Sequence, residues 1–152
     1  MKDKLLELSD AQALGALTST GVVSAYVPDM ELDASGGSTI IENDQLVCWL
    51  NLIFAANSAQ VGGTEGMNIY LRSCDNANMT SSSIDLAMVW VSATELTAGC
   101  KRSIKVCHSL TQKFVGLFYD PVSTTLTTGN TVDAWLSDRP ISENEDIQKP
   151  AA

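Results

Sequence analysis

The chain has 152 residues, of which 45% are hydrophobic and 18% are charged, and this composition excludes a wholly disordered protein because disorder needs low hydrophobicity and dense charge. Eighteen acidic and nine basic residues give a formal net charge of −9, so a phosphate backbone would repel the protein and we expect no nucleic-acid partner. No apolar run of the sequence approaches the roughly 20 residues that span a bilayer, so we expect no membrane partner either.

Residues 1–20 form the first predicted region, an N-terminal arm. Hydrophobic residues recur in it at near-helical spacing, and a Ser and a Gln three positions apart match the S-x-x-Q capping box that opens many helices. The apolar positions are Leu5, Leu8, Ala11 and Leu14, and the box is Ser9 with Gln12. Two interpretations stay open: a short helix packed on its own domain, or an arm that packs on another subunit. Because Glu7 and Asp10 interrupt the apolar stretch, we expect no secretion signal and synthesis in the cytosol.

Residues 21–137 form the second region, in which short apolar stretches alternate with clusters of Gly, Ser, Thr, Asn and Asp. This pattern is typical of an antiparallel β domain. The clusters, including a Gly-rich stretch at 58–66, are predicted loops. The predicted strands are 22–27, 38–41, 45–56, 67–74, 86–91, 103–108, 113–119 and 131–136.

The distribution of hydrophobic residues within these strands indicates a two-sheet sandwich. Strands 67–74 and 103–108 alternate between apolar and polar residues, so each buries one face. Strands 86–91 and 113–119 are apolar on both faces, which indicates that a neighbouring subunit covers the second face. We therefore expect an all-β, jelly-roll-like sandwich of about eight short strands, with a barrel as the alternative, that self-associates as a homodimer or homotrimer. Residues 138–152 follow as an extended, polar and acidic C-terminal tail.

Few residues could support catalysis. His108 is the one histidine of the chain, and its neighbour Cys107 would point to the opposite face of a strand, so the two cannot pair as base and nucleophile. The chain has four cysteines, and no two of them form a C-x-x-C pair, so we expect free thiols. They are Cys48, Cys74, Cys100 and Cys107. We expect no enzyme, no catalytic residue and no cofactor.

Metal ligands also lack the usual spacing. The cysteines and His108 do not arrive in the close pairs that structural zinc sites use. Asp29, Glu31 and Asp33 alternate along one segment, which would suit a calcium-binding loop, and the alternative is a solvated acidic strand edge. We expect no metal site.

Two groups of side chains are candidates for an interaction surface. Lys101, Arg102 and Lys105 form a positive cluster in an acidic chain, and this cluster would orient docking against an acidic partner unless it is simply a solvated face. Three tryptophans lie in three different predicted strands, where they are core or interface residues or, in the alternative, a stacking surface for sugars. They are Trp49, Trp90 and Trp135.

Short motifs at both ends of the β region carry a family resemblance. The first is SDAQAL at 9–14 followed by TST at 18–20, and the second is FVGLFY at 114–119 followed by TTLTTG at 124–129 and VDAWL at 132–136. They resemble the N-terminal arm and the last hairpin of the capsid cement proteins, or decoration proteins, of short-tailed bacteriophages. A strand at 67–72 and an Ala-Gly turn at 98–99 extend the resemblance over most of residues 9–136. The acidic tail has no match in that family.

The resemblance implies a jelly-roll-like domain on the outer surface of an icosahedral virion, where it clamps neighbouring subunits of the major capsid protein and self-associates. The alternative is a carbohydrate-binding β-sandwich module or a spike component for host attachment. The residues predicted to form the interface are Leu5, Leu8, Ser9, Asp10, Ala11, Gln12, Leu14, Lys101, Arg102 and Trp135.

Overall fold

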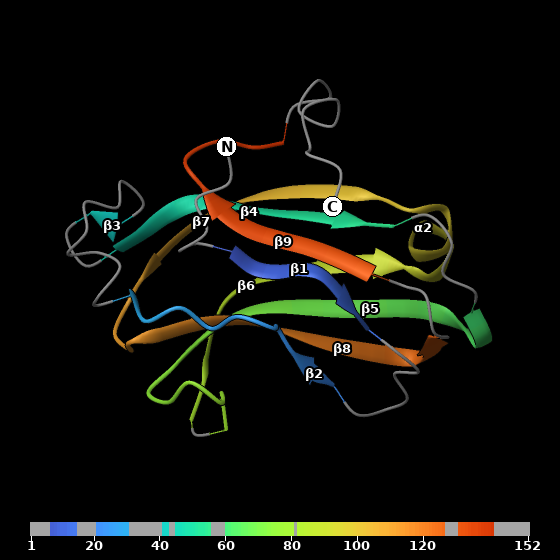
Figure 1. Cartoon of the computed structure of the whole chain (residues 1–152), viewed down its shortest axis with the longest axis horizontal. Helices are drawn as coiled ribbons and strands as arrows, with labels where there is room; N and C mark the ends of the chain where they lie inside the picture. The colour runs from blue at the N-terminus through green and yellow to red at the C-terminus, as the bar shows by residue number, and fades with distance from the viewer. Residues whose placement is uncertain are drawn as a thin grey trace.

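The computed structural model describes residues 7–14, 21–30, 41–42, 45–55, 60–80, 82–126 and 131–141. Within these ranges the chain forms two antiparallel sheets that pack face to face (Figure 1). The predicted two-sheet, all-β sandwich is therefore confirmed.

The larger sheet contains the first and the last strand of the domain. Its strands lie in the order β1 (Glu7–Ala13), β9 (Thr131–Ser137), β4 (Gln45–Phe54) and β7 (Lys101–Ser109). The two-residue strand β3 (Ile41–Glu42) pairs with the start of β4. Because β7 occupies one edge of β4 over most of its length, β3 and β9 share the other edge.

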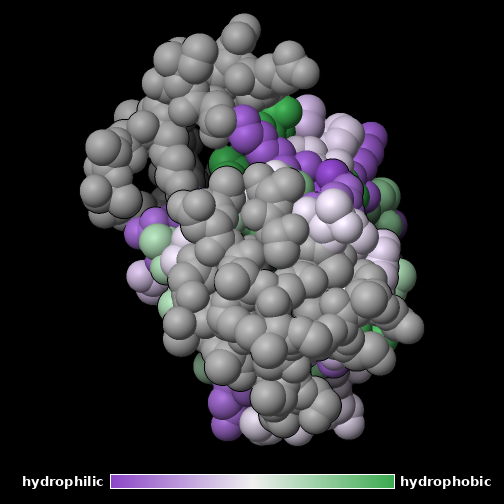
Figure 2. All heavy atoms as spheres, turned by 90° about the vertical axis from the view of Figure 1, so that its right-hand side faces the viewer, coloured by the Kyte–Doolittle hydropathy of each residue, from purple (hydrophilic) through white to green (hydrophobic). Residues whose placement is uncertain are grey.

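The smaller sheet contains four strands in the order β2 (Val22–Val23), β8 (Phe114–Leu126), β5 (Gln60–Cys74) and β6 (Ile84–Ser92). Helix α2 (Ala93–Ala98) follows β6 directly and leads to β7 in the other sheet. It lies at the right-hand end of the sandwich in Figure 1. In the view of that end, the described residues that are visible include both hydrophilic and hydrophobic ones (Figure 2).

The strand pairs are nested along the chain. When the short β3 is set aside, the first strand pairs with the last (β1 with β9), and the second pairs with the last but one (β2 with β8). The next pairs inward are β4 with β7 and β5 with β6. The chain is thus arranged like one long hairpin whose strand pairs belong alternately to the two sheets.

The core lies between the two sheets and follows from the alternation of side chains along each strand. Leu50 and Leu52 of β4 face Ile69 and Leu71 of β5 and their neighbours within one buried apolar cluster. Tyr119 of β8 is also fully buried. Its hydroxyl lies 2.9 Å from the hydroxyl of Ser9, so a hydrogen bond joins the two sheets inside the core.

The N-terminal helix predicted from the apolar spacing is wrong, because this segment forms strand β1 along β9. Among the described residues the sandwich thus begins at Glu7, not at residue 21. Irregularities in the pairing explain the misleading spacing. The register between β1 and β9 shifts twice, once on each side of Ser9, and Ala11 adopts a positive φ of 46°. These bulges displace the strict alternation by which a strand is usually detected in sequence.

The Gly-rich stretch at 58–66 was predicted as a loop, but β5 already begins at Gln60. Its pairing with β8 shifts register between Gln60 and Gly63 and again between Gly63 and Gly66. Gly66 has a φ of 145°, and a Cβ atom at this position would come within 2.2 Å of the Val91 carbonyl oxygen. Glycine is therefore required there for a strand to pass close to β6, and not for a turn.

Helix α2 was not predicted from the sequence. Ser92 caps this helix: its hydroxyl accepts a hydrogen bond from the backbone N–H of Glu95, while the Glu95 carboxylate accepts one from the backbone N–H of Ser92. The capping-box motif thus occurs at Ser92 and Glu95, whereas Ser9 and Gln12, where it was predicted, lie in strand β1. The S-x-x-E signal at 92–95 precedes only six helical residues, too few to show helical periodicity.

Candidate functional site

Strand β1 buries much of the predicted interface. Leu8, Ser9 and Leu14 are buried in the sandwich, whereas Asp10 and Ala11 are exposed. Leu5 lies outside the described residues. The described part of the predicted arm therefore packs on its own domain, and only its exposed residues remain available to a partner.

Polar contacts hold β1 in place on both sides. Ser9 donates a hydrogen bond to the Gln12 carboxamide oxygen (2.6 Å), so the hydrogen bond between Ser9 and Tyr119 is donated by the tyrosine. Gln12 in turn donates to the Val23 carbonyl oxygen (3.0 Å) and accepts from the Ala25 N–H (2.8 Å). Burial raises the pKa of Tyr119, opposed in part by the hydrogen bond with Ser9, so the phenol stays protonated at neutral pH. These side chains connect β1 to the smaller sheet.

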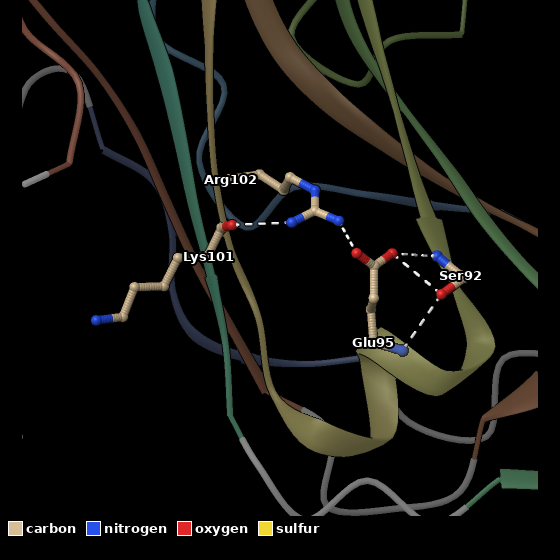
Figure 3. A network of polar contacts seen from close by, with 4 residues as sticks. All are labelled: Ser92, Glu95, Lys101 and Arg102. Carbon is tan, nitrogen blue, oxygen red and sulfur yellow. Dashed lines mark hydrogen bonds and ion pairs between the residues drawn. The ribbon is translucent and has the colours of Figure 1, made fainter. Parts of the chain in front are cut away.

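The predicted basic cluster is divided between two sides of β7. Lys101 and Lys105 are exposed and lie opposite Ile53 and Trp49, on the outer face of the larger sheet. Arg102 lies opposite the buried Leu52, and its guanidinium makes an ion pair with Glu95 of α2 (Figure 3). The prediction that Arg102 belongs to one docking patch with the lysines is therefore wrong.

The Glu95 carboxylate links two elements at the end of the sandwich. One of its oxygens pairs with Arg102, and the other accepts hydrogen bonds from the backbone N–H and the hydroxyl of Ser92, both at 3.0 Å. Arg102 also donates to the carbonyl oxygen of Lys101 at 3.2 Å (Figure 3). The Arg102 and Glu95 side chains are each about one third exposed to solvent, and exposed ion pairs of this kind add little stability. The network therefore links α2 to β7 without adding much to the free energy of unfolding.

The three tryptophans do not share a face. Trp49 and Trp135 are partly buried on the outer face of the larger sheet, whereas Trp90 is exposed on the outer face of the smaller sheet. A single stacking platform of all three is therefore excluded. Trp135 lies directly opposite Asn51 of β4.

The outer face of the larger sheet is closed over Asn51 by the chain that follows β9. Asn51 is 1% exposed. Its carboxamide oxygen accepts hydrogen bonds from the Ser103 hydroxyl (2.6 Å) and from the Ile141 N–H (3.1 Å). Its nitrogen donates to the Ser137 hydroxyl (2.8 Å) and the Arg139 carbonyl oxygen (3.2 Å). All four hydrogen-bonding positions of the carboxamide are thus used. We call residues 137–141 the C-terminal strap.

The outer face of the smaller sheet exposes an apolar surface. Met88 and Trp90 of β6 are 55% and 42% exposed. Tyr70 of β5 lies directly opposite Met88 on one side and opposite Phe118 of β8 on the other. Directly opposed side chains on one sheet face are in contact range. Met88, Trp90, Tyr70 and Phe118 therefore form one surface, which we call the aromatic face.

Arg72 stabilises the aromatic face from one end. Its guanidinium lies over the rings of Tyr70 and Phe118, 4.6 and 4.4 Å from their centroids. It also pairs with Asp85 of β6 at 2.5 Å. Strands 86–91 and 113–119 were both predicted to be covered by a neighbouring subunit. On the second of them, Phe118 is partly covered by the protein's own Arg72, whereas Met88 and Trp90 on β6 stay exposed.

Met88 and Trp90 were not among the residues predicted to form the interface. The signal was present, since residues 86–91 are apolar on both faces. A bulge at the start of β6 hid which face is outward: Leu71 lies opposite Ala87 but Arg72 lies opposite Asp85, so Leu86 is the additional residue.

The cysteines and His108 do not converge. The four cysteines form no disulfide, as predicted, with Cys48 and Cys74 buried and Cys107 exposed. Burial raises the pKa of Cys48 from 9.0 to about 12. Cys107 lies opposite Val47 and His108 opposite Leu46, so adjacent residues of β7 face opposite sides.

The described residues contain no group of three or more His, Cys, Asp or Glu side chains that could hold a metal ion. Of the calcium candidates, Asp29 lies 3.9 Å from the Lys113 ammonium group, and residues 31 and 33 are outside the described ranges. In the part of the chain described, no helix is long and apolar enough to span a membrane.

Comparison of the sequence with known protein families gives no match, and comparison with curated proteins gives none either. The aromatic face is thus assigned from its geometry alone.

Proposed function

We propose that the protein is a capsid cement protein, which binds the outer surface of an icosahedral phage shell and stabilises it by bridging subunits of the major capsid protein. The observation that carries the proposal is the aromatic face: an exposed apolar surface on a rigid sheet is the usual form of a protein-binding site. The resemblance of residues 9–20 and 114–136 to cement proteins specifies the partner.

The nested strand pairing supports the jelly-roll topology that this family implies. The first strand pairs with the last, the second pairs with the last but one, and the remaining pairs continue inward. This order results when one long hairpin wraps into two sheets. Such a domain presents a broad, stiff outer face to its partner. A stiff face loses little conformational entropy on binding.

A cement protein acts through linkage. A ligand that binds the assembled shell but not separated subunits stabilises the shell by RT ln(1 + [L]/Kd) at each site. When one copy contacts two subunits, the second contact forms at a high effective concentration, so release is slow. Small free energies at many sites then resist the outward pressure of packaged DNA.

The test compares shells with and without the protein. Decorated shells are expected to rupture at a higher temperature than bare shells, and purified protein added back should restore the difference. Trp90→Ala should lower the occupancy of shells, whereas Tyr26→Ala, which removes another exposed aromatic ring, should not. Equal rupture temperatures for decorated and bare shells would eliminate the cement function.

A carbohydrate-binding module for host attachment is the second candidate, and one row of the smaller sheet favours it. Asn68 lies directly between Trp90 and Asp120 on adjacent strands. An exposed indole beside a carboxamide and a carboxylate offers stacking and hydrogen bonds to a sugar ring. Under this candidate, Trp90→Ala abolishes binding to a glycan array and reduces adsorption to cells, and the robustness of shells does not change.

A further inference from the structure

Five of the described strands, β1, β2, β3, β6 and β7, pair with one neighbour only, and all except β6 carry a feature that discourages pairing with another chain; β3 is only two residues long. The edge at β1 has two register shifts and a residue with positive φ, Ala11. The edge at β7 has the exposed Lys101 and Lys105. The edge at β2 is only two residues long. Bulges, charges and short length are the devices by which natural sheets protect their edges.

The remaining edge, β6, carries a bulge at Leu86 and a charged residue, Asp85, only at its start. It is nine residues long, and from residue 87 to residue 92 its pairing with β5 is regular and it holds no charged side chain. Within the described residues no strand pairs with its second edge. A long, regular and unpaired edge presents a row of backbone donors and acceptors to any suitable strand.

The side chains of β6 are also unusually apolar for an edge. Among the described residues, the exposed large hydrophobic side chains are Tyr26, Ile84, Met88 and Trp90, and three of these four lie on β6. Its one charged residue, Asp85, pairs with Arg72 of the neighbouring strand. The strand therefore adds no uncompensated charge to a contact, although the whole chain carries a net charge of −9.

We infer that β6 pairs antiparallel with β6 of a second copy of this chain, so that two smaller sheets join into one continuous eight-stranded sheet. Identical antiparallel strands are related by a two-fold axis, and the contact is complementary to itself. We place the two-fold axis within the regular part of the strand, residues 87–92. For any such position, Asp85 of one copy lies opposite a residue after 88 of the other copy and never opposite the second Asp85. Like charges therefore do not meet in the joined sheet.

The pairing also places the two aromatic faces side by side on one surface. Met88 and Trp90 of both copies then line the centre of that surface, where they contribute most to excluding water. This pairing involves only copies of the protein itself and does not depend on whether the aromatic face binds a capsid.

The test is sedimentation of the full chain from micromolar to hundreds of micromolar concentrations. We expect a monomer–dimer equilibrium, which shifts toward dimer at higher salt because salt screens the repulsion between acidic copies. Met88→Lys and Trp90→Lys should each weaken the dimer by roughly tenfold or more, since each substitution places one lysine from either copy on the pair of strands that form the contact. Tyr26→Lys is the matched control: it changes an equally exposed aromatic residue away from β6 and should leave the equilibrium unchanged.

Hydrogen exchange locates the contact. The backbone amides of residues 84–92 should become more protected as the concentration of the wild-type protein rises, while those of β7 should not. Circular dichroism of each lysine variant checks that the fold is retained, as the exposure of both side chains leads us to expect.

A chain that stays monomeric throughout, a dimer that resists both β6 substitutions, or one that Tyr26→Lys disrupts equally would each overturn the inference. Protection of β6 that arises only when another protein is added would do so too.

Discussion

The two outer faces of the sandwich differ in how they meet their surroundings. The larger sheet is closed over Asn51 by its own chain, because the C-terminal strap covers this residue and, together with Ser103, uses every hydrogen-bonding position of its carboxamide. The smaller sheet is open, with Met88 and Trp90 exposed on its edge strand. One face thus buries a polar group and the other exposes apolar groups.

The difference shows how one fold separates stability from binding. A buried, fully satisfied polar network specifies a single arrangement of the chain. An exposed apolar surface does little for the isolated domain and gains its free energy only when a partner covers it. Substitutions on the two faces should therefore affect different measurements.

The largest effect is expected on the closed face. Asn51→Leu removes the four hydrogen bonds that the carboxamide makes with the Ser103 and Ser137 hydroxyls, the Arg139 carbonyl oxygen and the Ile141 N–H. The hydrogen bonds from Ile141 to Ser103 and from Ser137 to Arg139 then still hold the strap to this face and to itself. We expect a loss of about 2–4 kcal/mol in the free energy of unfolding, measured by urea denaturation. Asn68→Leu on the open face is the control and should cost less than about 1 kcal/mol. Similar losses for both variants would mean that the strap does not seal its face.

Alkaline pH tests the interior side of the closed sheet. The pKa of Cys48 is raised by burial to about 12 in the folded state, from 9.0. Its contribution to stability is therefore complete below pH 9 and is lost as the pH rises toward 12, because the unfolded chain loses this proton first. The expected slope from this thiol is at most about 1.4 kcal/mol per pH unit. Cys48→Ala should make the fall in stability between pH 9 and pH 11 shallower.

Thiol labelling gives an independent check on the same sheet. Cys107 is exposed on its outer side and should react at once with a thiol reagent, whereas the buried Cys48 should react only after the protein opens. Rapid labelling of both thiols in the folded protein would contradict the burial of Cys48 between the two sheets.

A smaller effect is expected where Arg72 supports the open face. Arg72→Met removes the cation–π contacts with Tyr70 and Phe118 and the ion pair with Asp85. We expect a loss of about 1 kcal/mol in thermal or chemical unfolding. Arg72→Lys keeps the charge without the planar group and should recover only part of that loss. Lys105→Met on the other sheet should change stability by less than about 0.5 kcal/mol.

The smallest effect on stability is expected at Met88. Its side chain is 55% exposed, so Met88→Ser should change the free energy of unfolding by less than about 0.5 kcal/mol. The same variant should weaken dimerisation or partner binding, because that is where the exposed methionine is covered. If Met88→Ser instead lowered the free energy of unfolding strongly and left association unchanged, the aromatic face would serve stability and not binding.

The sequence predicted the sandwich well because most of its strands keep the alternation that burial of one face requires. It failed where backbone irregularities break that alternation. In β1, two register shifts and the positive φ of Ala11 produced a spacing that resembles a helix. In β5, glycines that allow close passage of strands resembled a loop.

The candidate site was predicted less well, because it depends on which strand lies at an edge. The sequence shows that residues 86–91 are apolar on both faces but not that β6 has one neighbour and β8 has two. Likewise, no local pattern reveals that Arg102 faces Glu95 while Lys101 and Lys105 face outward. These distinctions arise from pairings between residues far apart in the chain.

The pairing of β1 with β9 sets the order of events during synthesis. Residues at the start of the chain must wait for residues 131–137 before their sheet can close. Closure of so long a loop is slow, and domains rich in such distant pairings fold in milliseconds to seconds, not microseconds. Until the ribosome has released the last strand, β4 lacks its neighbour β9 and the apolar interior is open on that side. A nascent chain stalled before residue 131 should therefore be sensitive to protease and bound by chaperones, and one released after residue 141 should be neither.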